Sequence, residues 1–392
     1  MKREFVAHRM KSIRPFYVME LLARARALEA EGRSIIHMEV GEPDFATPQP
    51  IIDGGKRALD EGRTGYTPAT GIPELRRAIA DDYQRRYGVE IKPERVVVTP
   101  GSSGALQLVM SVLINPGEAV LMADPGYPCN RHFVQLVSGE PVTLAVGPES
   151  GYQLTAEMVD QAWSDPTRAV MVASPSNPTG TLLSREELES IYRVVSRRGG
   201  VLIVDEIYQG LIYGGESCTA LSLADDIFVI NSFSKYYGMT GWRLGWLVAP
   251  ESHLGAIERL AQNIFLSAPT PAQYAALAAF SEETQAIVEQ RRDAFQARRD
   301  YLLPALRDLG FKVPVTPGGA FYLYADCSDL TDDSYRFAMD LLEQEGVAVT
   351  PGKDFGDNQP EKHLRFAYTT DIPKLEEGVR RLKQYIQSLA DG

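Results

Sequence analysis

The stretch from Asn231 to Gly245 has the sequence NSFSKYYGMTGWRLG, in which one lysine lies among hydroxyl groups and glycines. An arginine follows that lysine eight positions later (243 − 235). A protonated lysine is a poor nucleophile, so a catalytic lysine needs burial or a nearby positive charge that lowers its pKa. Arg243 offers such a charge and can also bind a phosphate through two parallel hydrogen bonds. The combination indicates a Schiff base between Lys235 and pyridoxal phosphate (PLP), whose ring accepts electrons.

Taken alone, the same stretch is equally consistent with a surface lysine in a glycine-rich loop. The rest of the chain must therefore supply further groups that suit a phosphate, a pyridine ring and an amino acid. Those groups have to converge on Lys235 in the folded protein.

Length, charge and cysteine content exclude several classes of protein. The 392 residues are enough for roughly two domains. A net charge of −12 argues against a nucleic-acid surface. The three cysteines (Cys129, Cys218 and Cys327) and the five histidines are scattered, so we expect no disulfide framework and no metal site. Neither a signal peptide nor a run of about eighteen apolar residues is present. We therefore expect a cytoplasmic enzyme.

From Arg95 onward, short apolar runs alternate with helical patterns. The predicted strands are Val96–Thr99, Ala119–Ala123, Val142–Val146, Ala169–Ala173, Val201–Val204, Phe228–Asn231 and Leu244–Val248. Several of these runs are almost continuously apolar, which is typical of parallel strands that are buried on both faces. Alternation with helices predicts βαβ units. We therefore expect an α/β fold with a mainly parallel seven-stranded sheet and helices on both faces.

The two ends of the chain have a different, α+β pattern. Near the start we expect a helix at Tyr17–Glu31 and a strand at Ile35–Val40. A long charged helix is expected from Thr284 to about Leu309, with Pro304 kinking or breaking it near its end. The later predicted elements are strands at Gly318–Tyr324, Val347–Thr350 and His363–Tyr368, and helices at Asp333–Glu345 and Pro373–Leu389. We predict a large domain at residues 46–283, and a smaller domain formed by residues 1–45 together with 284–392.

Polar residues and glycines follow five of the predicted strands directly. They occur in Gly101–Gly104, Asp124–Tyr127, Ser174–Gly180, Asp205–Tyr208 and Ser232–Lys235. Ligands of open α/β sheets bind at the carboxyl ends of the strands, so these segments are expected to meet at one site. The first of them also opens a helix, where backbone N–H groups suit a phosphate. Five converging strand ends are far more specific than any single motif.

The chemistry of PLP assigns a role to each of these groups. Asp205 is expected to hold the pyridine nitrogen protonated, while Asn177 and Tyr208 donate hydrogen bonds to the ring phenolate. Tyr127 is expected to stack on the ring. The groups expected to bind the phosphate are Gly101, Ser102, Ser103, Ser232 and Arg243.

Two further residues would act on the substrate. Arg365, in an apolar strand, is the candidate for binding the amino-acid carboxylate. Lys235 would carry the cofactor and then shuttle the α-proton. Other roles stay open: a helix N-cap for Asp205, a core side chain for Tyr127, and structural ion pairs for the two arginines.

From about residue 17 to the C-terminus, the chain resembles the class I/II, fold-type I PLP-dependent aminotransferases. The residues that carry the resemblance are Ser232-x-Ser234-Lys235-x-x-x-Met239-x-Gly241-x-Arg243-x-Gly245, Val40–Phe45, Tyr66 with Gly71, Asn177–Gly180 and Asp205-Glu206-x-Tyr208. The resemblance implies the aspartate aminotransferase-like fold, with Lys235 carrying the cofactor. It also implies that Gly41, Asn177 and Arg365 bind the substrate. The family is usually a homodimer with shared active sites, in which Tyr66 would reach the neighbour's phosphate.

One departure from the family limits what can be said of the substrate. Family members specific for dicarboxylates hold the side-chain carboxylate with a second arginine from the other subunit, but residues 260–288 contain no arginine. Arg14 could substitute for it. Cys129 and His132 either line the pocket or pack in the interior. Aspartate, alanine, aromatic, branched and sulfur amino acids all stay open as substrates.

Three functions are compatible with these residues. The leading one is an aminotransferase that moves the amino group of an L-amino acid to a 2-oxo acid by a ping-pong mechanism through pyridoxamine phosphate. The second is a C–S β-lyase or a cyclopropane-forming synthase of the same fold, since the reaction depends on which substrate bond stands perpendicular to the ring. The third is a non-catalytic PLP-binding regulator. Such regulators carry a DNA-binding domain, whereas about forty residues precede the Gly41 loop here.

Overall fold

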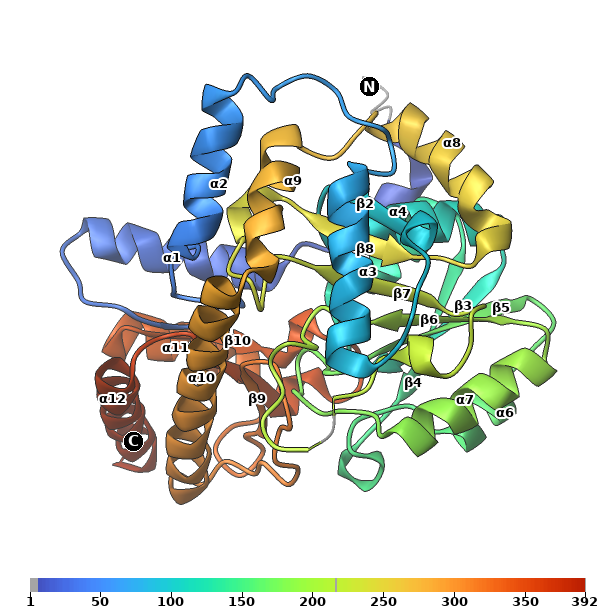
Figure 1. Ribbon diagram of the computed structural model, residues 1–392. Coiled ribbons are helices and arrows are strands. Elements are labelled where there is room, and N and C mark those ends of the chain that lie inside the picture. The colour runs from blue at the N-terminus through green and yellow to red at the C-terminus, as the bar shows by residue number, and fades with distance from the viewer. Residues whose placement is uncertain (1–5, 216, 392) are drawn as a thin grey trace, which may run out of the picture.

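A seven-stranded sheet forms the centre of the larger part of the molecule (Figure 1), in a computed structural model that describes residues 6–215 and 217–391. The strand order is β2-β8-β7-β6-β5-β3-β4. The strands are β2 (Val96–Thr99), β3 (Ala119–Asp124), β4 (Glu140–Ala145), β5 (Thr167–Ala173), β6 (Val201–Asp205), β7 (Phe228–Ser232) and β8 (Gly245–Val248). Strand β8 runs antiparallel to both of its neighbours, β2 and β7, whereas all other neighbouring strands are parallel. All seven predicted strands are present, and the mainly parallel sheet is confirmed.

Helices cover both faces of this sheet because its strands are apolar on both sides. Val96 and Val98 of β2 belong to one hydrophobic cluster, whereas Val97 between them belongs to another. The first cluster includes α3 (Pro73–Tyr87), α6 (Ala156–Ala162), α7 (Arg185–Arg197) and α9 (Thr270–Leu277), and the second includes α4 (Gly101–Leu113), α5 (Pro128–Leu136) and α8 (Leu254–Ile264). A capping box formed by Ser184 and Glu187 begins α7, as the sequence pattern indicates.

A smaller four-stranded sheet lies beside the large one. Its order is β1-β10-β11-β9, which places the N-terminal strand β1 (Ile36–Met38) next to β10 (Val347–Pro351). The remaining strands and the helices that pack on this sheet are β9 (Tyr322–Asp326), β11 (His363–Ala367), α1 (Tyr17–Ala30), α11 (Ser334–Glu345) and α12 (Ile372–Asp391). The N-terminus and the C-terminal third therefore form one α+β unit. The domain boundaries at residues 45/46 and 283/284 stay predictions.

The long helix α10 (Glu282–Asp308) contains Pro304 but is not broken by it. Of the kink or break predicted at Pro304, the break is not found, and the kink stays a prediction. Proline removes one backbone hydrogen bond near the end of the helix, while Leu302, Leu303 and Leu306 around it are buried. Their packing keeps the last turn helical. In Figure 1, α10 runs alongside α12 of the smaller unit, and α2 (Gln49–Asp60) lies near α9. Among the described residues, no helix has the length and apolar character needed to span a membrane.

Candidate active site

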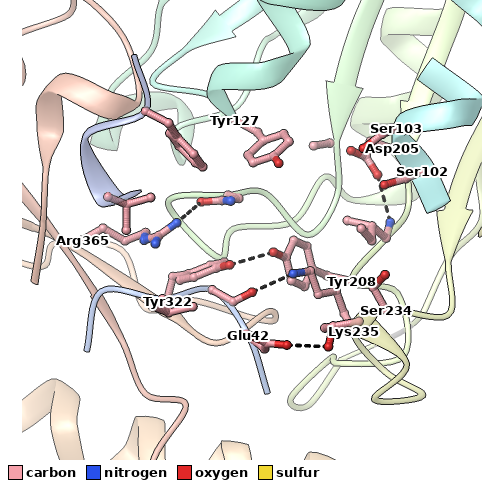
Figure 2. A pocket seen from close by; sticks show the side chains of 18 of the residues that line it. Glu42, Ser102, Ser103, Tyr127, Asp205, Tyr208, Ser234, Lys235, Tyr322 and Arg365 are labelled. Carbon is pink, nitrogen blue, oxygen red and sulfur yellow. Dashed lines mark hydrogen bonds between the residues drawn. The ribbon is translucent and has the colours of Figure 1, made fainter. Parts of the chain in front are cut away.

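A cavity of about 310 Å³ lies where the carboxyl ends of the large-sheet strands meet the smaller sheet and the N-terminal segment. Each of the five predicted strand-end segments contributes to its wall, through Ser102, Ser103, Tyr127, Pro175, Asn177, Asp205, Ile207, Tyr208, Ser234 and Lys235. Gly41, Arg243 and Arg365 also line it. In Figure 2, Arg365 lies at one end of the cavity and Ser102 and Ser103 lie at the other, with Tyr127 between them. The predicted convergence of strand ends is therefore present.

Lys235 is positioned by the loop that joins the antiparallel strands β7 and β8. Its Nζ donates a hydrogen bond to the carbonyl oxygen of Gly41 at 2.7 Å. Burial lowers the pKa of Lys235 to about 8, and the positive charges of Arg365 and Arg243 add to this effect against the opposing Glu42 and Asp205. A neutral amine, which is the nucleophilic form, is thus accessible close to neutral pH.

Asp205 ends strand β6 and is buried in the cavity wall. Its Oδ1 accepts a hydrogen bond from the backbone N–H of Ile207 at 3.1 Å. Burial raises the pKa of Asp205 to about 6, although that hydrogen bond and the nearby Lys235 oppose the rise. No helix begins at Asp205 in the described chain, because the residues after it form turns. The helix N-cap role is therefore not observed, and the carboxylate is available for a ligand.

Two tyrosines meet between the strand ends and the smaller sheet. The hydroxyl groups of Tyr208 and Tyr322 are 2.8 Å apart and hydrogen-bonded (Figure 2). Burial raises the pKa of the Tyr208 hydroxyl well above its ordinary value, so this group is a proton donor at neutral pH. Burial raises the pKa of Tyr127 in the same way, and Tyr127 lines the cavity rather than only the core.

The end of the cavity near Ser102 and Ser103 combines free backbone N–H groups with the guanidinium of Arg243, which are groups that bind anions. Both serines lie in the first turn of α4, whose N-cap, Pro100, provides no side-chain hydrogen bond to the free N–H groups. Gly101 precedes them with a φ of +70°, and a Cβ on this residue would lie 2.7 Å from Nη2 of Arg243. A side chain at position 101 would therefore displace the guanidinium. Among the described residues, the hydrogen-bond partner of the Arg243 side chain is the carbonyl oxygen of Thr240, at 3.0 Å.

Arg365 lies on β11, between β10 and β9, and only 3% of it is exposed. Its Nη1 donates to Oδ1 of Asn177 at 3.0 Å, and its Nη2 donates to the carbonyl oxygen of Glu39 and to Oγ1 of Thr350. Its Nε has no partner among the described residues. All the observed partners are neutral oxygens, so the structural ion pair considered for Arg365 is not found in the described chain. The buried Asp354 interacts with this guanidinium electrostatically, but its carboxylate is hydrogen-bonded to the N–H groups of Tyr17 and Val18. A buried cation without a directly paired anion is costly, and an incoming carboxylate would relieve that cost.

Three predicted site residues do not line the cavity. Gly101 does not line the cavity itself, but the guanidinium of Arg243, which does, lies against it. Ser232 is buried and lies outside the cavity lining, and its Oγ hydrogen-bonds to Oγ of Ser234 at 2.9 Å and to the carbonyl oxygen of Leu244 at 3.2 Å. Ser234 lines the cavity in its place. Tyr66 is 85% exposed. The roles predicted for Ser232 and Tyr66 in phosphate binding stay predictions.

Three other residues that the sequence singled out also lie outside the cavity lining. Arg14 pairs with Asp357 through Nη1 and Oδ1 at 2.7 Å and is exposed. Cys129 is half-buried next to Tyr127. Nδ1 of His132 lies 2.9 Å from Oε1 of Gln135 on the same helix. None of the three contributes to the described wall around Lys235.

The structure adds site residues that sequence reasoning missed. They are Tyr322, Glu42, Ser234, Thr240 and four apolar residues of the N-terminal segment, Phe16, Val18, Met19 and Leu22. A Cβ on Gly41 would lie 2.1 Å from the hydroxyl oxygen of Tyr322, so the packing of Tyr322 requires a glycine there. The sequence predicted a loop after Val40 and a strand at Gly318–Tyr324, but it could not predict that these two segments are in contact.

Comparisons with protein families, curated proteins and solved structures all match aminotransferases. The family model described as "Aminotransferase class I and II" matches residues 33–382. Valine–pyruvate aminotransferase of Mycobacterium tuberculosis is 39% identical over 376 residues, which are 95% of this chain and 97% of that protein. A (5-formylfuran-3-yl)methyl phosphate transaminase of Methanocaldococcus jannaschii is 38% identical over 97% of this chain and 99% of its own. A crystal structure of an aminotransferase from M. tuberculosis superposes with a TM-score of 0.95 at 38% identity, covering 98% of this chain and 100% of that one.

Proposed function

We propose that this chain, which belongs to the class I and II aminotransferases, binds PLP around Lys235 and receives the substrate carboxylate at Arg365. The chain is an aminotransferase with the aspartate aminotransferase-like fold. The proposal that this cavity is the active site rests on one observation. A lysine whose pKa is lowered by burial to about 8 shares a cavity with a buried arginine that has an Nε without a partner in the described chain.

The residues of the cavity fit PLP in charge and in hydrogen-bonding capacity. Gly101 leaves room for the guanidinium of Arg243 next to the first turn of α4, which suits a phosphate. Asp205 offers a carboxylate for the pyridine nitrogen. The hydroxyl of Tyr208 and the amide of Asn177 suit the ring phenolate, and Oδ1 of Asn177 already accepts from Arg365. This last contact directs the other end of the amide, its N–H donor, away from Arg365.

When bound, PLP supplies a conjugated ring that accepts the electron pair left by a broken bond at the substrate Cα. The chain itself does the rest. Arg365 fixes the carboxylate by charge-assisted hydrogen bonds and so sets the orientation of the Cα substituents. Lys235 accepts and returns the α-proton at Nζ, for which a pKa of about 8 is well matched to neutral pH. The carbonyl oxygen of Gly41, 2.7 Å from Nζ, holds the amine on that side.

The test is the visible absorption spectrum of the purified holoenzyme while single amino acids are added without any 2-oxo acid. For an active donor, we expect the band of bound PLP to convert to that of pyridoxamine phosphate, with one equivalent of the matching 2-oxo acid released. Release of ammonia and pyruvate while the PLP band persists would instead identify a β-lyase. Failure of the protein to take up added PLP would contradict the role of Lys235.

We also propose a homodimer in which Tyr66 completes the site of the other subunit. Its support is that Tyr66 is 85% exposed and lies outside the cavity of its own chain. Mixing inactive Lys235→Ala protein with Tyr66→Phe protein tests this. Hybrid dimers would contain one fully wild-type site, so the kcat/KM of the mixture should exceed the sum of the separate variants. If Tyr66 serves its own subunit, mixing will give no gain.

A further inference from the structure

We infer that the amino donor of this enzyme has a large, uncharged apolar side chain, which is received by the start of α1, and that Asp354 positions this receiving surface. The inference deepens the proposed function and rests on it. The surface consists of Phe16, Val18, Met19 and Leu22, and is called the side-chain subsite below.

The charges around the cavity leave no cation for a second carboxylate. The charged residues among its lining are Glu42, Asp205, Lys235, Arg243 and Arg365. In the proposed site the three cations serve the cofactor, its phosphate and the α-carboxylate, and Asp205 serves the pyridine nitrogen. The remaining charge, Glu42, is an anion that accepts a hydrogen bond from Oγ1 of Thr240. A side-chain carboxylate would lose its hydration without gaining a cationic partner in the described cavity, which is unfavourable.

Arg14 does not change this balance. It is exposed, it is paired with Asp357 at 2.7 Å, and it lies outside the cavity lining. To reach a substrate it would have to give up that partner. The cation that the sequence offered as a substitute for the family's second arginine is therefore engaged elsewhere.

Helix α1 has two apolar faces, and one of them borders the cavity. Leu21, Ala25 and Leu28 pack against Leu342 and Ala348 of the smaller unit. At about 100° per residue, Val18, Met19 and Leu22 fall within an arc of about 100° next to that packed stripe.

This second arc is only partly covered. Met19 lines the cavity and is 55% exposed, so part of its apolar surface is free to be covered by a ligand. An apolar substrate side chain laid against Met19 and Leu22 removes apolar surface from water on both sides. The subsite thus gains most from a substrate that is long and apolar.

Asp354, from the C-terminal part of the chain, fixes the start of α1. The N-cap of the helix, Phe16, has no side-chain acceptor for the free N–H groups. The carboxylate of Asp354 accepts from the N–H of Tyr17 at 2.7 Å and from that of Val18 at 2.8 Å. Only 4% of Asp354 is exposed, and its negative charge also complements the positive end of the helix dipole. Asp354 therefore caps the turn that carries the side-chain subsite.

The loop that follows Asp354 is attached to the large unit. It is bound by Asp124 at the end of β3, whose carboxylate accepts from the N–H of Asp357 at 2.8 Å and from that of Asn358 at 3.3 Å. Asp354 does not touch the cavity, so it is a positioning residue and not a catalytic one.

Two unreactive carboxylates of similar size test the side-chain class by equilibrium binding to the PLP-loaded enzyme. We expect 4-methylpentanoate, which corresponds to leucine without its amino group, to bind at least about tenfold more tightly than pentanedioate, which corresponds to glutamate. Titration of the visible absorption band gives both dissociation constants. Equal or tighter binding of pentanedioate would overturn the inference, whereas absence of PLP uptake would instead contradict the proposed function.

A charge placed in the side-chain subsite should shift this preference. Met19→Arg is expected to lower the ratio of the two affinities by about tenfold. Ala27→Arg introduces the same charge at an exposed position of α1 outside the cavity lining and should leave the ratio unchanged. The same shift in both variants would mean that a general charge effect, and not the subsite, sets the preference, and this would overturn the inference.

The positioning role of Asp354 is tested by comparing Asp354→Ala with Asp354→Asn. We expect the alanine variant to retain PLP but to lose about tenfold in the preference for leucine over alanine, measured as the ratio of kcat/KM values. Asparagine keeps one acceptor oxygen and should restore part of that preference. An unchanged ratio in a folded, PLP-loaded alanine variant would rule out the positioning role.

Discussion

Replacement of Gly101 by alanine should weaken PLP binding far more than it weakens the fold. The added methyl group meets two obstacles. A φ of +70° is a left-handed conformation that costs an alanine about 1–2 kcal/mol. The new Cβ would also lie 2.7 Å from Nη2 of Arg243, the far end of a flexible side chain. The guanidinium can move away at little cost to folding, but it then leaves the phosphate end of the cavity.

The chain offers a matched control for the first obstacle. Gly62 has a φ of +69°, and no heavy atom lies within 4 Å of the position that a Cβ would occupy there. Gly62→Ala therefore carries the backbone cost alone. We expect both variants to lose about 1–2 kcal/mol of unfolding free energy, measured by urea denaturation of the apoprotein. A hydrogen bond to a charged group contributes about 1.5–3 kcal/mol, so loss of the Arg243 contact should raise the Kd of PLP about 10- to 150-fold in Gly101→Ala only.

The assay is fluorescence titration of each apoprotein with PLP at one ionic strength, because the contact is electrostatic. If Gly101→Ala and Gly62→Ala bind PLP equally well, the guanidinium of Arg243 does not hold the phosphate. If Gly62→Ala also weakens PLP binding, the effect comes from general destabilisation. Either result would refute the reasoning from the Gly101 contact.

The remaining predictions concern the reacting groups and the substrate carboxylate. Lys235→Ala should abolish transamination while circular dichroism shows an intact fold; retained turnover would remove this lysine from the mechanism. Arg365→Lys keeps the charge but loses the planar pair of donors, so the KM for amino acids should rise about 10- to 100-fold, and an unchanged KM in steady-state assays would exclude its role. Because burial lowers the pKa of Lys235 to about 8, its nucleophilic neutral form increases as pH rises toward that value. The rate of PLP uptake by the apoprotein, followed by stopped-flow absorbance, should therefore increase about tenfold per pH unit up to about pH 8 and then level off. A rate that is constant between about pH 6 and 8 would contradict the lowered pKa.

The large sheet could be predicted from the sequence because its signals are local. Buried strands such as Val96–Thr99 and Val201–Asp205 are short apolar runs, and each is followed at once by the polar residues of the site. Since the carboxyl ends of parallel strands share one edge, the positions of Tyr127, Asn177 and Asp205 followed from chain order alone.

The missed residues depend on contacts between distant segments. Tyr322 lies 114 positions from its partner Tyr208, and periodicity shows which face of a strand is buried but not what covers it. Val18, Met19 and Leu22 look like an ordinary amphipathic helix, and only the packing of α1 turns part of that helix toward the cavity. The helix continues past Pro304 for a similar reason, because tertiary packing outweighed the local signal for a break.

The reversal of chain direction at β8 has a consequence for the stability of the segment that carries Lys235 and Arg243. Strands β7 and β8 form one hairpin, in which Ser232 pairs with Gly245, and its loop carries both Lys235 and Arg243. Strand β6 flanks this hairpin on one side and β2 on the other, so the hairpin is not at an edge. Local opening is easiest at frayed edges and hardest in the middle of a sheet. Amide hydrogens of the paired hairpin strands should then exchange with water only through global unfolding, so the segment that carries Lys235 and Arg243, the proposed covalent and ionic anchors of PLP, should keep its shape as long as the protein is folded.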